Sequence, residues 1–178
     1  NINGGKNTSY NDISELTSSD WDMNRLYSIK GRLVWVDNDN WRIEDENDSQ
    51  KYIMLKNPNA GILSEQLGNY DPNNFIITMT GFVYKDDSGV NRLEIKRSAT
   101  GIRPILSDVS VVQADGNDVY SFKTTDADGG LVNIGSRLPV GARVYFAVNE
   151  GFDANDRMIE VNGQKIEGDS FVINSEKT

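Results

Sequence analysis

The chain has 178 residues, of which 37% are hydrophobic and 25% are charged, a composition typical of globular proteins. Its 27 acidic and 18 basic residues give a net charge of −9, which makes it a poor default binder of nucleic-acid phosphates. Cysteine and histidine are both absent, which excludes disulfides, thiolate nucleophiles, sulfur-ligated metals and the usual general base near neutral pH, and we therefore expect no enzymatic activity and no cofactor.

Residues 1–20 are predicted to be a flexible N-terminal segment, because they are rich in Gly, Asn, Ser and Thr. One short helical turn is predicted at Asp12–Leu16, with Asn11 or Asp12 as its cap. The first residue is Asn, and no stretch is apolar over the ~20 residues that a bilayer-spanning helix needs. We expect a processed or trimmed chain, and its composition is what would remain if a leader and an anchoring cysteine were cut away.

Residues 21–105 are predicted to form a first domain of five strands. The leading strand, Leu26–Val36, has Gly31 at its centre, and a glycine inside a strand marks a bulge, a bend or a close backbone approach. A strand that bends there can belong to two sheets and so close a small barrel. The other four strands are separated by polar turns and are predicted at Trp41–Asp45, Lys51–Lys56, Phe75–Lys85 and Arg92–Arg97.

A single helix is predicted between the third and fourth strands. Its apolar residues recur at helical spacing within Ala60–Leu67, and Gly68 is placed to end it. Three strands, a helix and a hairpin, with central glycines at Gly31 and Gly81, resemble the oligonucleotide/oligosaccharide-binding (OB) fold. That resemblance implies a barrel whose second and third strands face a groove, and another small antiparallel barrel or sandwich is the alternative.

A second domain is predicted over residues 106–178. The stretch Ser98–Ser107, with Gly101 and Pro104, is interpreted as a linker or as the last barrel strand continuing into one. The fold class is therefore mainly β: a five-stranded OB-like barrel with one short helix, followed by a small antiparallel β domain. Short strands of this second domain are predicted at Val109–Ala114, Val119–Lys123, Leu131–Ile134, Arg143–Val148, Met158–Val161 and Ser170–Ile173.

Five turn and strand motifs follow one another in the second domain. They are Gly129-Gly130, Pro139 with Gly141, Asn149-Glu150-Gly151-Phe152, Val161-Asn162-Gly163 and Phe171-Val172-Ile173. In this order they resemble the bacterial B-repeat-like modules related to those of internalins. The two resemblances together imply a Bacteroidetes-type surface lipoprotein, extracytoplasmic at the cell surface or in the periplasm, which contacts the membrane only through a lipid anchor outside this sequence.

We therefore expect a non-catalytic binding or adhesion module that contacts a glycan or a protein. Two alternatives stay open, a single-stranded nucleic-acid-binding OB protein and a purely structural spacer, and the oligomeric state is also open. Basic residues beside Trp35, Trp41 and Tyr52 favour the nucleic-acid alternative. Carboxylates that interrupt the same strands oppose it, so we expect a partner other than nucleic acid.

The candidate ligand-binding residues lie on the second and third strands. Side chains alternate between the two faces of a strand, so Trp41, Ile43 and Asp45 share one face and Arg42 and Glu44 the other. With Ile53 and Leu55 turned inward, Tyr52 and Met54 stand outside beside Arg42. We expect a partner to use a groove lined by Arg42, Glu44, Tyr52 and Met54, unless the second domain or the N-terminal segment covers it.

One acidic turn, Asp126-Ala127-Asp128-Gly129-Gly130, invites a calcium interpretation, because Ca²⁺ takes several converging carboxylate oxygens. An EF-hand loop needs a glutamate about twelve positions from the first ligand, and Arg137 stands there instead. We therefore interpret this stretch as a solvated acidic turn and expect no metal site.

Overall fold

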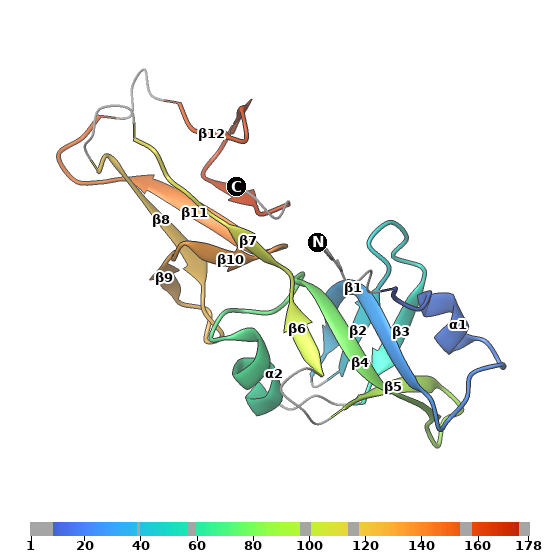
Figure 1. Ribbon diagram of the computed structural model, residues 1–178. Helices are drawn as coiled ribbons and strands as arrows, with labels where there is room; N and C mark the ends of the chain where they lie inside the picture. The colour runs from blue at the N-terminus through green and yellow to red at the C-terminus, as the bar shows by residue number, and fades with distance from the viewer. Residues whose placement is uncertain are drawn as a thin grey trace, which may run out of the picture. The chain divides into compact units, whose positions relative to one another are not determined.

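The computed structural model describes residues 9–38, 40–56, 60–96, 101–113, 118–153 and 158–174. Arg97 and Ser98–Thr100, which end the fifth predicted strand and begin the predicted linker, lie outside the described residues, as does Ala114. The chain divides into two compact units, residues 1–59 with 77–103 and residues 60–76 with 104–178. Both units are built mainly of strands (Figure 1), so the predicted mainly β fold class is confirmed.

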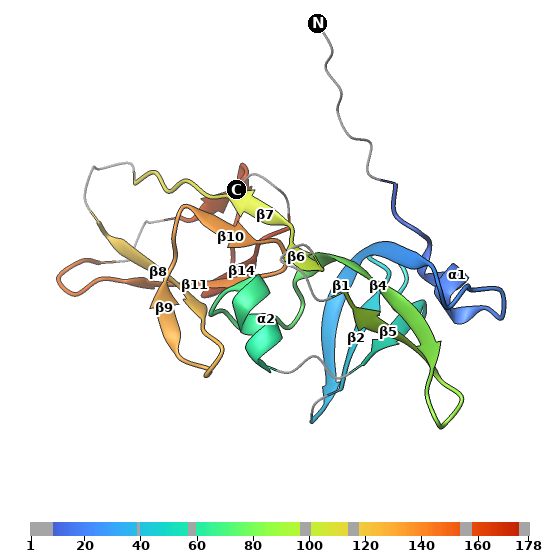
Figure 2. The ribbon, with the colours of Figure 1, turned by 60° about the horizontal axis from the view of Figure 1, so that its bottom comes forward.

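The first unit is a closed five-stranded barrel. Its strands are β1 (Leu26–Asp37), β2 (Asn40–Glu44), β3 (Tyr52–Leu55), β4 (Ile76–Lys85) and β5 (Asn91–Ile95). They pair in the order β1-β2-β3-β5-β4, β3 and β5 run parallel, and β4 also pairs with β1 to close the barrel (Figure 2). This arrangement is compatible with an OB-like domain.

Strand β1 closes the barrel by pairing with both β2 and β4. Ile29 and Leu33 are fully buried, and Gly31 occupies the inward position between them. A Cβ on Gly31 would lie 2.3 Å from the backbone oxygen of Glu44, and one on Gly81 of β4 would lie 2.2 Å from a backbone oxygen of β5. The close backbone approach expected at these glycines is confirmed, because neighbouring strands leave no room for a side chain. The register irregularity between β1 and β2 lies further along, between Trp35 and Asp37.

A five-residue helix, α1 (Ile13–Thr17), begins where the sequence predicts a helical turn. The Asp12 carboxylate accepts the backbone N–H of Ser14 at 2.9 Å, and the Glu15 carboxylate accepts that of Asp12 at 3.3 Å. This reciprocal arrangement is a capping box, which satisfies backbone donors that the first turn leaves without partners. Of the two predicted capping residues, Asn11 and Asp12, Asp12 is therefore the N-cap.

Helix α1 is an integral part of the first unit, although it lies within the segment 1–20 that composition predicts to be flexible. Ile13 and Leu16 are both buried. The backbone N–H of Asn11 donates to the carbonyl of Ser28 in β1 at 2.7 Å, and the Asn91 side chain in β5 donates to the carbonyl of Leu16 at 3.0 Å. Figures 1 and 2 both draw α1 next to the barrel strands.

The second unit contains helix α2 (Ala60–Leu67) and several small antiparallel sheets. A four-stranded sheet has the order β14-β11-β8-β9, and two further pairs are β10 with β7 and β12 with β13. Strand β6 (Ile102–Pro104), in contrast, extends the barrel sheet beside β4. The strands of the second unit are β7 (Leu106–Asp108), β8 (Tyr120–Thr125), β9 (Leu131–Asn133), β10 (Arg137–Pro139), β11 (Arg143–Val148), β12 (Glu160–Val161), β13 (Gln164–Lys165) and β14 (Ser170–Val172).

Residues 98–107 are interpreted from the sequence as a linker or as the last barrel strand continuing into one, and the described part, residues 101–107, supports the second alternative. Strand β6 extends the barrel sheet, and both Ile102 and Ser107 are fully buried. One prediction about this region needs correction. The predicted strand at Val109–Ala114 is wrong over its described residues, where Val112 is 90% exposed and has no strand neighbour to pack on. The strand that pairs with β10 is β7, which comes earlier in the chain. It was not predicted, because a strand of three residues shows too little alternation of apolar and polar residues in the sequence.

The motif glycines of the second unit occupy turns. Gly129, Gly141, Gly151 and Gly163 all have positive φ angles, a conformation that glycine adopts without steric cost. Asn162 and Gly163, with φ of 50° and 78°, form the two-residue turn between β12 and β13. The predicted turn roles of these residues are therefore confirmed.

Residues 60–76, which follow β3 in the chain, belong by their contacts to the second unit. Leu63 and Leu67 of α2 are buried, and Gly68 ends the helix with a φ of +84°. After it, the N–H of Asp71 donates to the carbonyl of Thr125 at 3.1 Å, and a second backbone hydrogen bond joins residue 127 to residue 69. These long-range hydrogen bonds tie residues 60–76 to β8.

Candidate binding groove

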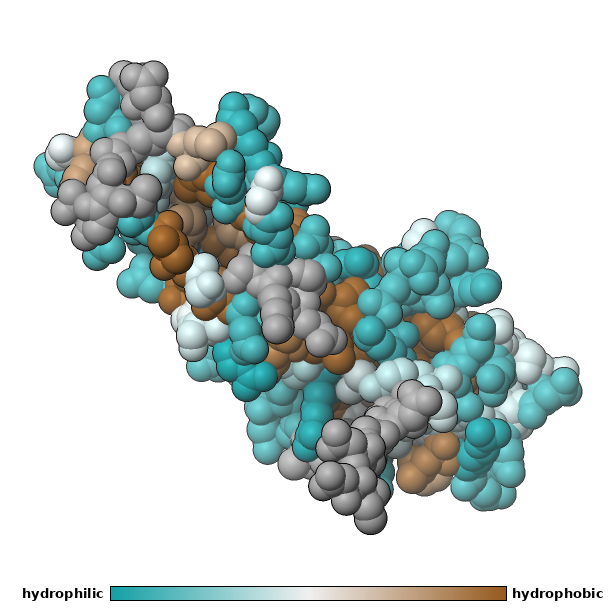
Figure 3. Space-filling view, turned by 45° about the horizontal axis from the view of Figure 1, so that its top comes forward, coloured by the Kyte–Doolittle hydropathy of each residue, from teal (hydrophilic) through white to brown (hydrophobic). Residues whose placement is uncertain are grey.

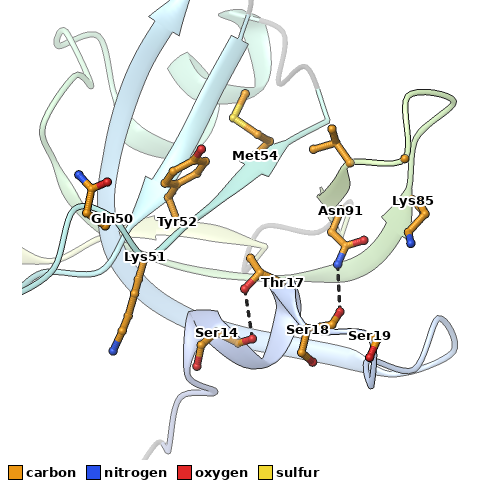
Figure 4. Close-up of a pocket in the computed structure, with 12 residues that line it drawn as sticks. Ser14, Thr17, Ser18, Ser19, Gln50, Lys51, Tyr52, Met54, Lys85 and Asn91 are labelled. Carbon is orange, nitrogen blue, oxygen red and sulfur yellow. Dashed lines mark hydrogen bonds between the residues drawn. The ribbon is translucent and has the colours of Figure 1, made fainter.

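An open groove of about 540 Å³ lies within the first unit (Figure 4). It is lined by α1 with the two residues after it, by the start of β3 with the two residues before it, and by the turn between β4 and β5. Its volume falls within the range of about 300–1,000 Å³ that small-molecule sites occupy. The groove is therefore large enough to hold a ligand rather than a single water molecule.

Two of the four predicted site residues line this groove. Tyr52 and Met54 of β3 both face it, while Ile53 and Leu55 on the opposite face of the strand are buried in the barrel core. Tyr52 is 39% exposed, so its ring is available to a ligand. The predicted division of β3 between core and outer face is confirmed.

The other two predicted residues support Tyr52 from the neighbouring strand. Arg42 of β2 donates from Nε to Oε1 of Glu44 at 2.8 Å, and its guanidinium carbon lies 4.3 Å from the centre of the Tyr52 ring. Glu44 is only 8% exposed, and pairing with Arg42 offsets the cost of burying its charge. Because Arg42 does not line the groove, its cation–π contact holds the tyrosine ring from outside it.

The wall that faces β3 consists of polar groups from α1, which the sequence reasoning did not include in the site. The Thr17 hydroxyl donates to the carbonyl of Ser14 at 3.2 Å, and the Ser18 hydroxyl donates to that of Glu15 at 2.9 Å. Asn91 from β5 donates to the carbonyl of Ser18 at 3.2 Å, as Figure 4 shows. The N-terminal segment thus borders the predicted patch.

The third side of the groove is the β4–β5 turn, which Asp86 organises. One carboxylate oxygen of Asp86 accepts the backbone N–H groups of Ser88 and Val90, both at 2.9 Å, and the other accepts Nε of Arg92 at 2.6 Å. The hydrogen bonds from Arg92 and from the turn amides hold the pKa of Asp86 below its ordinary value. The ionised carboxylate therefore stabilises the turn that presents Lys85 and Asn91 to the groove.

This arrangement predicts an acid-sensitive turn. Because the pKa of Asp86 is lower in the folded protein than in the unfolded chain, its stabilising effect is present above the unfolded-state pKa and is lost as pH falls through the folded-state pKa. Asp86→Asn should lower the melting temperature at about pH 7 and should reduce the loss of melting temperature between about pH 7 and pH 3. The control is Asp87→Asn, at an exposed neighbour, and equal effects of the two substitutions would contradict this role.

Among the ten described Lys and Arg side chains of the first unit, at least four form ion pairs with carboxylates. Each such pair reduces the positive charge that could neutralise a phosphate backbone, which weighs against the nucleic-acid interpretation. The pairs are Lys30 with Glu46 at 3.5 Å, Lys56 with Glu94 at 3.3 Å, Arg92 with Asp86 at 2.6 Å, and Arg42 with Glu44.

The acidic turn at residues 126–130 is held by its own hydrogen bonds. Asp126 uses one carboxylate oxygen to accept the N–H groups of Asp128 and Gly130, at 3.0 and 2.7 Å, as an acidic turn does.

Within the described ranges, no three His, Cys, Asp or Glu side chains are placed to hold a metal ion, and no helix is long and apolar enough to cross a membrane. On the face in Figure 3, apolar side chains emerge in several places between hydrophilic ones.

No family model, curated protein or solved structure matches this chain. The groove and the sequence motifs are therefore the basis for proposing a function. Tyr52 and Met54 line the groove, whereas Arg42 and Glu44, which the sequence also predicts to line it, lie behind the Tyr52 ring.

Proposed function

We propose that this protein is a non-catalytic binding module that holds a saccharide in the groove of its barrel. The observation that carries the proposal is an oriented tyrosine, Tyr52, in an open groove whose other walls supply hydroxyl and amide groups. A sugar ring has an apolar C–H face that packs on an aromatic ring, and hydroxyls around its edge that form hydrogen bonds. A few placed polar groups around an apolar contact are what binding sites use to orient a ligand.

The setting that we propose is the outside of a bacterial cell. The five motifs of the second unit support it, because they resemble B-repeat-like surface modules. In lipid-anchored proteins, modules of this kind accompany binding domains. In this setting the barrel would act in adhesion or in contact with surface glycans. A protein ligand in the same groove is the nearest variant of this proposal.

The double substitution Tyr52→Ser with Met54→Ser tests the proposal on a broad glycan and protein binding screen of the intact chain. We expect the wild type to bind saccharides and the double variant to lose that binding. Its melting temperature should stay close to that of the wild type, because Tyr52 is partly exposed. The control is Phe82→Ser, which removes a 40% exposed aromatic ring of β4 that does not line the groove and should leave binding intact.

Three results would contradict the proposal. A fall of several degrees in melting temperature would mean that Tyr52 and Met54 act in packing, since truncating buried apolar residues costs about 2–5 kcal/mol each. Sub-micromolar binding of single-stranded DNA at about 0.15 M salt, without saccharide binding, would support the nucleic-acid alternative. A screen without any saccharide or protein ligand would favour a structural spacer.

A further inference from the structure

The charge of the groove differs from that of the protein that carries it. The chain has a net charge of −9, yet the residues that line the groove include two lysines, Lys51 and Lys85, and no Asp or Glu. Figure 4 shows these two lysines on opposite sides of the opening. Two lysines without a carboxylate among the lining residues favour a ligand of negative charge, because they attract it within the groove itself.

These two lysines are available to a ligand. Among the residues that the structure describes, neither has a carboxylate within ion-pair distance, in contrast to Lys30, Lys56 and Arg92. Six carboxylates lie close in sequence to the lining segments, but none of them lines the groove: Asp12, Glu15, Asp20, Asp48, Asp86 and Asp87. Several of them accept backbone or side-chain hydrogen bonds from nearby residues, among them Asp12 from Ser14, Glu15 from Asp12, Asp48 from Gln50 and Asp86 from Arg92.

The polar wall indicates which anion fits best. The hydroxyls of Thr17 and Ser18 donate to helix carbonyls, and the N–H₂ group of Asn91 donates to the carbonyls of Leu16 and Ser18, so these side chains can only accept further hydrogen bonds. The Ser18 oxygen already accepts the N–H of Asp20 at 3.2 Å, so Thr17 and Asn91 have the larger acceptor capacity left for a ligand. An acceptor-rich wall needs a ligand that donates hydrogen bonds. Sugar hydroxyls donate, whereas the phosphodiester groups of a nucleic-acid backbone only accept.

From these observations, and resting on the proposed saccharide-binding function, we propose that the groove selects an acidic saccharide. A sugar ring lies against the face of Tyr52 that Arg42 leaves open, its hydroxyls donate to the α1 wall and Asn91, and its carboxylates pair with Lys51 and Lys85. Charge-assisted hydrogen bonds of this kind are the strong ones in a polar site. Neutral saccharides would keep the ring contact and lose the two ion pairs.

Short oligosaccharides of uronic acids and their methyl esters test the inference on the intact chain by calorimetric titration. The ester keeps the sugar backbone and removes only the negative charge. With oligogalacturonides, mannuronate oligomers and hyaluronan fragments as probes, we expect at least one acid to bind at about 0.15 M salt and its ester to bind about tenfold more weakly. Lys51→Gln and Lys85→Gln should each weaken binding of the acid about three- to fivefold, as exposed ion pairs do.

The matched control is Lys96→Gln, which removes the same charge at an exposed position of the first unit that does not line the groove. It should change the affinity less than about twofold. Equal binding of acid and ester at a groove that still requires Tyr52 would overturn the preference for acids and leave the proposed function standing. Lysine-dependent binding of polyglutamate or inorganic polyphosphate that equals the binding of the uronates would overturn the assignment to a saccharide. The absence of binding by every uronate would overturn the preference for acids, and binding of neutral saccharides in the glycan screen would then leave the proposed function standing.

Discussion

Replacing Gly31 by alanine is expected to destabilise the barrel by about 3 kcal/mol, at the upper end of the range for overpacked cores. The added Cβ would lie 2.3 Å from the backbone oxygen of Glu44 and 2.7 Å from Cγ2 of Ile43. The first of these neighbours is a backbone group of the β1–β2 ladder, where Arg32 pairs with Glu44. It cannot rotate away as a flexible side chain would, so β1 must separate from β2.

The three tryptophans of the chain, Trp21, Trp35 and Trp41, all belong to the first unit, so tryptophan fluorescence during denaturant unfolding reports on the barrel. The control is Gly135→Ala, because a Cβ there meets nothing within 4 Å and the residue does not have a positive φ. It should change the free energy of unfolding by less than about 0.5 kcal/mol. Equal unfolding midpoints for the two variants would show that β1 does not approach β2 as closely as described.

Replacing Leu16 by alanine is expected to cost about 2–5 kcal/mol, the usual cost of truncating a fully buried leucine. Leu16 is 0% exposed, and it lies on the helix that forms one wall of the groove. The loss should appear in the tryptophan-monitored unfolding of the barrel. Saccharide binding should weaken as well, because Thr17 and Ser18 are positioned by the same helix.

Leu26→Ala provides the matched comparison, since Leu26 is the 38% exposed first residue of β1. It should cost well under half of what Leu16→Ala costs, because less of its side chain leaves an apolar environment on unfolding. Similar small costs for the two variants would mean that residues 12–17 behave as the flexible tether that their composition indicates.

Much of the barrel could be predicted from the sequence because its strands carry strong local signals. In β1, apolar side chains alternate on both sides of Gly31, and a glycine at an inward position has few explanations other than a close approach of backbones. The same alternation placed Tyr52 and Met54 on the outer face of β3 beside Arg42. This alternation relates residues only two positions apart in the chain, so it can be recognised in a single sequence.

The parts that could not be predicted depend on contacts between distant residues. The helical turn at Asp12–Leu16 could be predicted, but its attachment to the barrel could not, because only Ile13 and Leu16 are buried and the helix is held by the distant residues Asn91 and Ser28. For the same reason, the polar wall of the groove was not predicted. Strands β7 and β10 pair over three residues each, which is too short for a periodic pattern.

The central claim is that the groove between α1, β3 and the β4–β5 turn is a ligand site. Backbone amide chemical shifts of the isotope-labelled intact chain, recorded while a short oligosaccharide of galacturonic acid is added, test it most directly. The predicted result is a set of shifts at residues 14–19, 50–54 and 85–91, with the amides of β8, β11 and β14 unchanged. Shifts confined to the second unit, or spread over barrel strands away from these three segments, would contradict it.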